Sequence, residues 1–170
     1  MKGKVVLIGS AVIMLSVFLS GCKKENEGLN RITVSGNTNT EYNQDYIPDG
    51  ASYVLPRIWD CATSLYRSDI WIHFASGSTF WMALYLPDSE GRLPTGTFSY
   101  APACSEGFTA SFYYAPPKKP AGVCFSSGTV IIGRKGDVYD IKLDLEIDPD
   151  CGGGTLKGGF HGTMTVEEVR

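Results

Sequence analysis

One segment, Val138–Ile147, constrains the fold of this chain more than any other part of its sequence. Its large apolar residues alternate with smaller or charged ones: Tyr139, Ile141, Leu143, Leu145 and Ile147 alternate with Val138, Asp140, Lys142, Asp144 and Glu146. Successive side chains of a β-strand point to opposite faces of a sheet, so the pattern predicts a strand with one face in a core and the other in water. Residues 148–152 then predict a turn, and residues 156–166 predict a returning strand.

Shorter segments of the same kind precede this strand. They are residues 68–74, 80–86, 97–100, 108–114 and 130–133. A short helical turn around residues 58–65 is also compatible with the sequence, but no other segment favours a helix. About seven strands between turn-rich segments predict an all-β protein with a single antiparallel β-sandwich, immunoglobulin-like or jelly-roll-like, over residues 51–170. A small β-barrel is the alternative.

The N-terminus has the composition of a secretory signal. Lys2 and Lys4 precede an apolar run over residues 5–19, which is shorter than the roughly 20 residues that a membrane-spanning helix needs. The run ends in Leu19-Ser20-Gly21-Cys22. This pattern predicts a signal peptide over residues 1–21.

Leu19-Ser20-Gly21-Cys22 resembles the lipobox of bacterial lipoproteins. The resemblance implies that the Cys22 thiol receives a diacylglyceryl group, that the peptide is cut before this cysteine, and that its new amine is acylated. Two acyl chains anchor a protein stably, so the expected partner is a membrane. An ordinary signal peptide with a chance cysteine is the alternative.

Residues 22–50 are polar, with one short β-like stretch at residues 32–34, and predict a flexible tether. Lys23-Lys24-Glu25-Asn26-Glu27 resembles the lysine-plus-acid cluster of Bacteroidota lipoproteins that are exported to the outer face of the outer membrane. The expected location is therefore the cell envelope, lipid-anchored in the outer membrane. A solvated linker is the alternative for this cluster.

Parts of the body resemble small Bacteroidota-type cell-envelope lipoproteins with a single β-sandwich domain. The resemblance lies in Leu93-Pro94-Thr95-Gly96-Thr97-Phe98, in residues 128–130 and 139–141, and in Gly158-Gly159-Phe160-His161-Gly162. Most of those proteins have no assigned activity, so the resemblance implies a fold and a location but no catalytic residues.

Four cysteines follow Cys22, and an even number in an exported chain indicates two disulfides. They are Cys61, Cys104, Cys124 and Cys151. We expect Cys104 to pair with Cys124, since this bridge would close a proline-rich loop and contribute ~3 kcal/mol, and Cys61 to pair with Cys151. None of the spacings suits a zinc site, and we expect no metal and no cofactor.

Charge and catalytic motifs exclude some functions. The net formal charge is −3 and no basic stripe occurs, so nucleic acid is not an expected partner. Two histidines, His73 and His161, and the carboxylates of Asp140, Asp144 and Glu146 are the only candidates for acid–base chemistry. Exposed polar faces of strands account for the same residues. Asp148-x-Asp150-x-Gly152 predicts a turn held by Asx hydrogen bonds rather than a calcium loop.

Aromatic residues are concentrated early in the predicted domain, including Trp59 and Tyr66. Trp71, Trp81 and Tyr85 fall opposite the more aliphatic side of their strands. If these strands form a hairpin, the two tryptophans share one sheet face, which predicts a binding face for a glycan or a protein. Packing into the core is the alternative.

These observations favour a non-catalytic envelope lipoprotein that binds a glycan or a protein. Two other classes stay open. One is a small envelope hydrolase that uses Asp140, Asp144 and a histidine, and the other is a structural or assembly subunit of an envelope complex.

Overall fold

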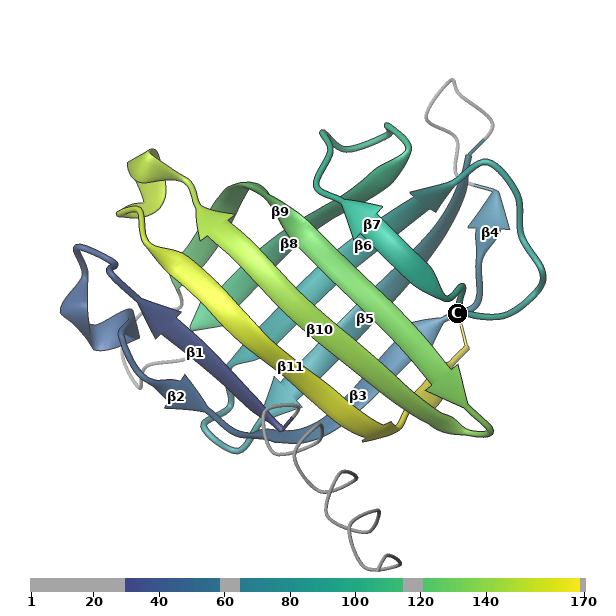
Figure 1. Ribbon diagram of the computed structural model, residues 1–170, viewed down its shortest axis with the longest axis horizontal. Coiled ribbons are helices and arrows are strands. Elements are labelled where there is room, and N and C mark those ends of the chain that lie inside the picture. Colours follow the sequence, from purple (N-terminus) through teal and green to yellow (C-terminus); the bar gives the residue numbers. More distant parts are fainter. Residues whose placement is uncertain (1–29, 59–64, 115–120, 169–170) are drawn as a thin grey trace, which may run out of the picture.

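The computed structural model describes residues 30–58, 65–114 and 121–168 (Figure 1). These residues form an all-β structure, as predicted, with twelve strands in one mixed, open sheet and two short 3-10 helices. In this part of the chain, no helix has the length and apolar character to span a membrane. The predicted signal peptide, Cys22 and the first part of the tether lie outside the described residues.

The strands follow the chain in order. They are β1 (Arg31–Ser35), β2 (Asp45–Tyr46), β3 (Pro48–Val54), β4 (Arg57–Ile58), β5 (Tyr66–Phe74), β6 (Thr79–Leu86), β7 (Gly96–Ser99), β8 (Gly107–Tyr114), β9 (Ala121–Lys135), β10 (Val138–Ile147), β11 (Thr155–Thr163) and β12 (Thr165–Glu167). The 3-10 helices are η1 (Thr40–Tyr42) and η2 (Pro149–Cys151). The strand order is β12-β3-β5-β6-β8-β9-β10-β11-β1-β2, with β4 on β5 and β7 on β9. Within the described residues, the β12–β3 pair is parallel and the other pairs of neighbouring strands are antiparallel.

Two predictions are corrected here. About seven antiparallel strands were expected, but the described residues form twelve, and β12 pairs with β3 in parallel. Three of the additional strands, β2, β4 and β12, are only two or three residues long, too short to show alternation. The tether was expected to reach residue 50, yet β1 pairs with β11 from Arg31 to Ser35. The sheet therefore begins within the predicted tether. Of the helical turn suggested around residues 58–65, Ile58 belongs to β4 instead, and residues 59–64 lie outside the described part of the chain.

The sheet is bent along β9, so its two halves face each other. Residues 121–124 of β9 pair with β8, and residues 125–135 pair with β10. Figure 1 shows β9, β10, β11 and β1 crossing in front of β8, β6, β5 and β3. The halves meet at aromatic contacts such as Tyr53–Tyr139, whose ring centroids are 5.8 Å apart. One apolar core therefore lies between them.

The alternation in β10 is confirmed, because Tyr139, Ile141, Leu143, Leu145 and Ile147 are all buried. The partly or fully exposed residues alternate with them. In β6, residues on both faces are buried, as expected for a central strand, and β6 lies between β5 and β8.

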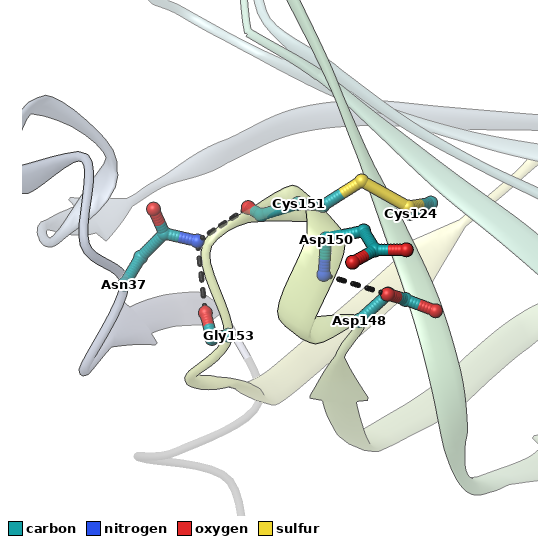
Figure 2. The surroundings of a disulfide bond; sticks show 6 residues. All are labelled: Asn37, Cys124, Asp148, Asp150, Cys151 and Gly153. Carbon is teal, nitrogen blue, oxygen red and sulfur yellow. Dashed lines mark hydrogen bonds between the residues drawn. A yellow bond between two sulfur atoms is a disulfide. The ribbon is translucent and has the colours of Figure 1, made fainter.

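A disulfide joins Cys124 of β9 to Cys151 of η2, with a Cα–Cα distance of 6.0 Å (Figure 2). The predicted pairings of Cys104 with Cys124 and of Cys61 with Cys151 are therefore both wrong. The end of β10 brings η2 beside β9, where the Asp148 amide donates to the Cys124 carbonyl at 2.9 Å. Cys104 is also disulfide-bonded, and Cys61 lies outside the described residues.

Asn37 ties the loop after β1 to the loop around η2. Its Nδ2 donates to the carbonyls of Cys151 at 3.0 Å and Gly153 at 2.8 Å (Figure 2), while its Oδ1 accepts from the Asn39 amide at 2.8 Å. Asn37 is buried, and buried polar atoms are stable when they are hydrogen-bonded. This side chain therefore holds two segments that are far apart in the sequence.

The predicted Asx turn at residues 148–152 is confirmed. Asp148 caps η2, and its carboxylate accepts a hydrogen bond from the Asp150 amide at 2.8 Å (Figure 2). Gly152 follows in the left-handed conformation with φ of 94°. A Cβ at this position would lie 2.7 Å from Asn37 Oδ1, so both backbone conformation and space require glycine.

Candidate binding face

Trp71 and Trp81 lie directly opposite each other in the β5–β6 hairpin. Their chain neighbours, such as Ile70, Ile72 and Phe80, are fully buried in the core. Because side chains alternate along a strand, both indoles lie on the outer face of this half of the sheet, and both are half-buried. The sequence prediction that the two tryptophans share a face is confirmed.

Trp81 is held in place by an ion pair. Its Nε1 donates to Asp69 Oδ1 at 3.1 Å, and the same oxygen accepts from Arg67 Nε at 3.0 Å and Nη2 at 2.6 Å. The Arg67 guanidinium also lies 5.7 Å from the centroid of the Trp81 ring, within the range of a cation–π contact. The indole is thus fixed by the carboxylate that accepts its hydrogen bond and by the guanidinium that lies over its ring.

Asp69 is only 4% exposed, and a buried carboxylate is costly unless it is paired. The Arg67 guanidinium and the Trp81 indole both satisfy it. The sequence interpretation missed Arg67 and Asp69 as part of this face. The sequence could have indicated them, because Arg67 and Asp69 precede Trp71 at intervals of two residues, and alternate residues of a strand lie on the same face.

Tyr85 also points to the outer side of β6, but it is 3% exposed. It lies opposite Arg67 in the register and is covered, so it is not available to a ligand. The predicted binding face is therefore corrected to exclude Tyr85. Of the other aromatic residues, Tyr66 packs against the core, and Trp59 lies outside the described residues.

Polar side chains continue the tryptophan row across the sheet. Ser52 of β3 is opposite Trp71, and Ser111 of β8 is opposite Trp81. The next row contains His73, which is exposed, and Tyr113, which is 50% exposed. We call Ser52, Trp71, Trp81, Ser111, His73 and Tyr113 the aromatic face.

Ser52 contacts both an imidazole and a carboxylate. Its hydroxyl donates to Glu167 Oε1 at 2.5 Å and lies 3.4 Å from His73 Nε2. In a serine nucleophile arrangement the histidine lies between the serine and the acid and removes the hydroxyl proton. Here the hydroxyl lies between the other two groups and gives its hydrogen bond to the carboxylate. This geometry joins β12 to β3 rather than activating a nucleophile.

The other candidates for acid–base chemistry lie on the outer face of the second half of the sheet. Asp140 of β10 is hydrogen-bonded to His161 Nδ1 of β11, and Asp144 forms an ion pair with Lys157 at 2.9 Å. The hydrogen bond that the Lys157 ammonium donates to the Asp144 carboxylate raises the pKa of Lys157. Asp140 and Asp144 are thus each paired with a cross-strand neighbour, whereas Glu146 is exposed and lies opposite Thr155.

The two histidines belong to strands that are not neighbours, β5 and β11, so the structure does not bring them together. Within residues 30–58, 65–114 and 121–168, no group of three His, Cys, Asp or Glu side chains is arranged to hold a metal ion. The aromatic face is therefore the predicted site that the geometry supports best.

Comparisons with models of protein families, with curated proteins and with solved structures find no match to this chain. The functional argument therefore depends on the residues of this chain.

Proposed function

We propose that this protein is a non-catalytic lipoprotein of the cell envelope, anchored through lipid on Cys22, and that its aromatic face binds a glycan. The observation that supports this proposal most is the Trp71–Trp81 pair on one outer sheet face, with the Trp81 indole held by Asp69 and Arg67. Indole rings that are already fixed lose little conformational entropy when a ligand stacks on them.

The chemistry around the two indoles suits a sugar. A pyranose ring has an apolar C–H face that stacks on an aromatic ring, and hydroxyls at its edge that need hydrogen-bonding partners. Ser111 and the exposed His73 lie one strand or one row from the indoles and offer such partners. A protein partner would instead favour fully desolvated anchors at the centre of a patch, so we favour the glycan.

The finer architecture is also part of this proposal. We infer a β-sandwich rather than a barrel, because the sheet is open and its bent halves enclose one core. In such a domain one outer face can be presented to the outside while the other half carries the tether. The envelope location is supported by the lipobox resemblance, and the outer-membrane anchor by the resemblance of Lys23-Lys24-Glu25-Asn26-Glu27 to an export cluster.

Replacing Trp71 or Trp81 by alanine is expected to weaken glycan binding by about tenfold or more, since loss of one stacked ring removes at least ~1.4 kcal/mol. Affinity electrophoresis of the mature protein in gels that contain soluble envelope or plant polysaccharides measures the effect. Ile131→Ala is the matched control, because Ile131 is also an exposed apolar residue but lies on β9, outside the aromatic face. Unchanged migration of both tryptophan variants in a gel that retards the wild type would contradict the proposal, as would unfolding of both.

Lipidation is tested separately. Intact-mass measurement of detergent-extracted protein is expected to give residues 22–170 plus the mass of the acyl groups, and Cys22→Ser is expected to abolish that added mass. Two acyl chains make release from a membrane negligible, so the wild type should stay in the membrane fraction. Soluble, unacylated wild-type protein would refute the lipid anchor. It would not bear on glycan binding by the aromatic face, which the tryptophan variants test.

A further inference from the structure

A second candidate site lies at one end of the sheet, away from the aromatic face. A pocket of about 690 Å³ is formed by the segment between β6 and β7, by Phe98 of β7 and by the β9–β10 turn. No residue of the aromatic face lines it. Concave sites of this size with a few fixed polar groups are the usual form of small-molecule sites.

The apolar part of the pocket is firmly attached to the core. Leu93 is buried although it lies between strands, and Leu86 is buried at the end of β6. Phe98 is partly buried and packs against the same core. These three side chains give the pocket an apolar wall that does not depend on a mobile loop tip.

Arg134 supplies a cation whose orientation is fixed. Its Nε donates to the Gly136 carbonyl at 2.7 Å, and its guanidinium carbon lies 5.3 Å from the centroid of the Tyr139 ring. Burial raises the pKa of Tyr139 to about 12, so this ring stays neutral beside the guanidinium. Among the described residues, the nearest carboxylate to its Nη2 is that of Asp137 at 3.7 Å, and the Asp137 side chain is 95% exposed.

The pocket's other charged groups differ in how far a partner neutralises their charge. Arg92 is paired with Glu90 at 2.5 Å, so each largely cancels the other. Arg134 therefore stays as the cation that is fixed against the pocket wall, and Asp88 and Thr95 add hydrogen-bonding groups along the same lining. A guanidinium donates two parallel hydrogen bonds to a carboxylate.

We propose that this pocket binds a small hydroxylated carboxylate of the uronic-acid type, with its carboxylate on Arg134, its ring face against Phe98 and its hydroxyls toward Asp88 and Thr95. The proposal does not depend on the aromatic face. It assigns the pocket a ligand by charge and shape, and it predicts that a neutral sugar of the same shape binds poorly.

Isothermal titration calorimetry of the mature protein in detergent, with D-galacturonate and with methyl galactoside as probes, tests this assignment. We expect saturable binding of galacturonate, and a dissociation constant at least about tenfold larger for the neutral sugar, as for loss of a charged hydrogen-bonded pair. Arg134→Gln should weaken galacturonate binding by a similar factor. Arg31→Gln is the control, since Arg31 is an exposed arginine paired with Asp45 and lies outside the pocket.

Arg134→Lys keeps the charge but loses the paired donors, so it should bind galacturonate with an affinity between those of the wild type and Arg134→Gln. This second variant guards against a folding defect, which the thermal midpoint reveals. No saturable galacturonate binding, equal binding of the neutral sugar, or wild-type affinity in Arg134→Gln would overturn the proposal. The tests of the two sites can fail independently, because galacturonate binding is tested at Arg134 and polysaccharide binding at Trp71 and Trp81.

Discussion

Replacing both Cys124 and Cys151 by alanine is expected to lower the free energy of unfolding by about 3.5 kcal/mol. The two cysteines are 27 residues apart in the sequence, and in the chain-entropy model a closed loop of this size restricts the unfolded chain by about that amount. The native contacts of η2 with Asn37 would also lose their covalent support. Urea unfolding without reductant, followed by tryptophan fluorescence, measures the loss.

Omitting the reductant keeps the disulfide of Cys104 intact, so the wild type and the double variant differ only in the Cys124–Cys151 disulfide. Peptide mapping under the same conditions checks the connectivity directly. A Cys124–Cys151 peptide is expected, and Cys61 is the expected partner of Cys104 when Cys22 carries lipid. A peptide that joins Cys104 to Cys124 would contradict the structure, and an unchanged free energy of unfolding in the double variant would contradict the predicted stabilisation.

The second large effect is expected at the centre of the core. Phe112→Ala should cost about 3 to 5 kcal/mol, because the side chain is completely buried and its removal leaves a cavity. Its ring contacts Tyr46 at a centroid distance of 4.7 Å and Phe74 at 5.8 Å. These residues come from β2 and β5, so the cavity would weaken the packing of three strands.

Tyr113→Ala is the matched control for this prediction. Tyr113 is the next residue of the same strand, but it is 50% exposed and points outward. Its replacement should change the free energy of unfolding by only about 0.5 kcal/mol. Equal losses at the two positions, measured by urea unfolding, would show that the inner and outer faces of β8 have been assigned incorrectly.

The strands that could be predicted from the sequence are those with several alternating residues. Val138–Ile147 has the same bounds in prediction and structure, and the β5–β6 hairpin differs by only one or two residues at its ends. The strands that were not predicted are β2 and β4, which have only two residues each, and β3, whose sequence begins with the turn-like Pro48-Asp49-Gly50. β1 was indicated only by a β-like stretch at residues 32–34, and the single strand predicted over residues 156–166 is divided between β11 and β12. Their pairing depends on partners far along the chain, which local patterns do not specify.

The same limit applies to the sites. The shared face of Trp71 and Trp81 could be predicted because a hairpin joins them locally. The disulfide was predicted wrongly because loop length was used to choose the partner of Cys124, whereas the position of η2 beside β9 decides it. The pocket combines side chains from between residues 86 and 98 with Arg134 and Gly136, and the pairing of β7 with β9 brings these distant segments together.

Asn37 has a consequence for the chemical lifetime of the protein. Its amide nitrogen donates to two carbonyl oxygens, and an aspartate at this position would point a carboxylate oxygen at them instead. Hydrolysis of this one amide, a common form of protein ageing, would therefore replace two attractions by two repulsions in a buried place. Such damage would weaken the link between the loop after β1 and the loop around η2, leaving the hydrogen bond from the Thr38 amide to the Gly152 carbonyl, without breaking the peptide chain.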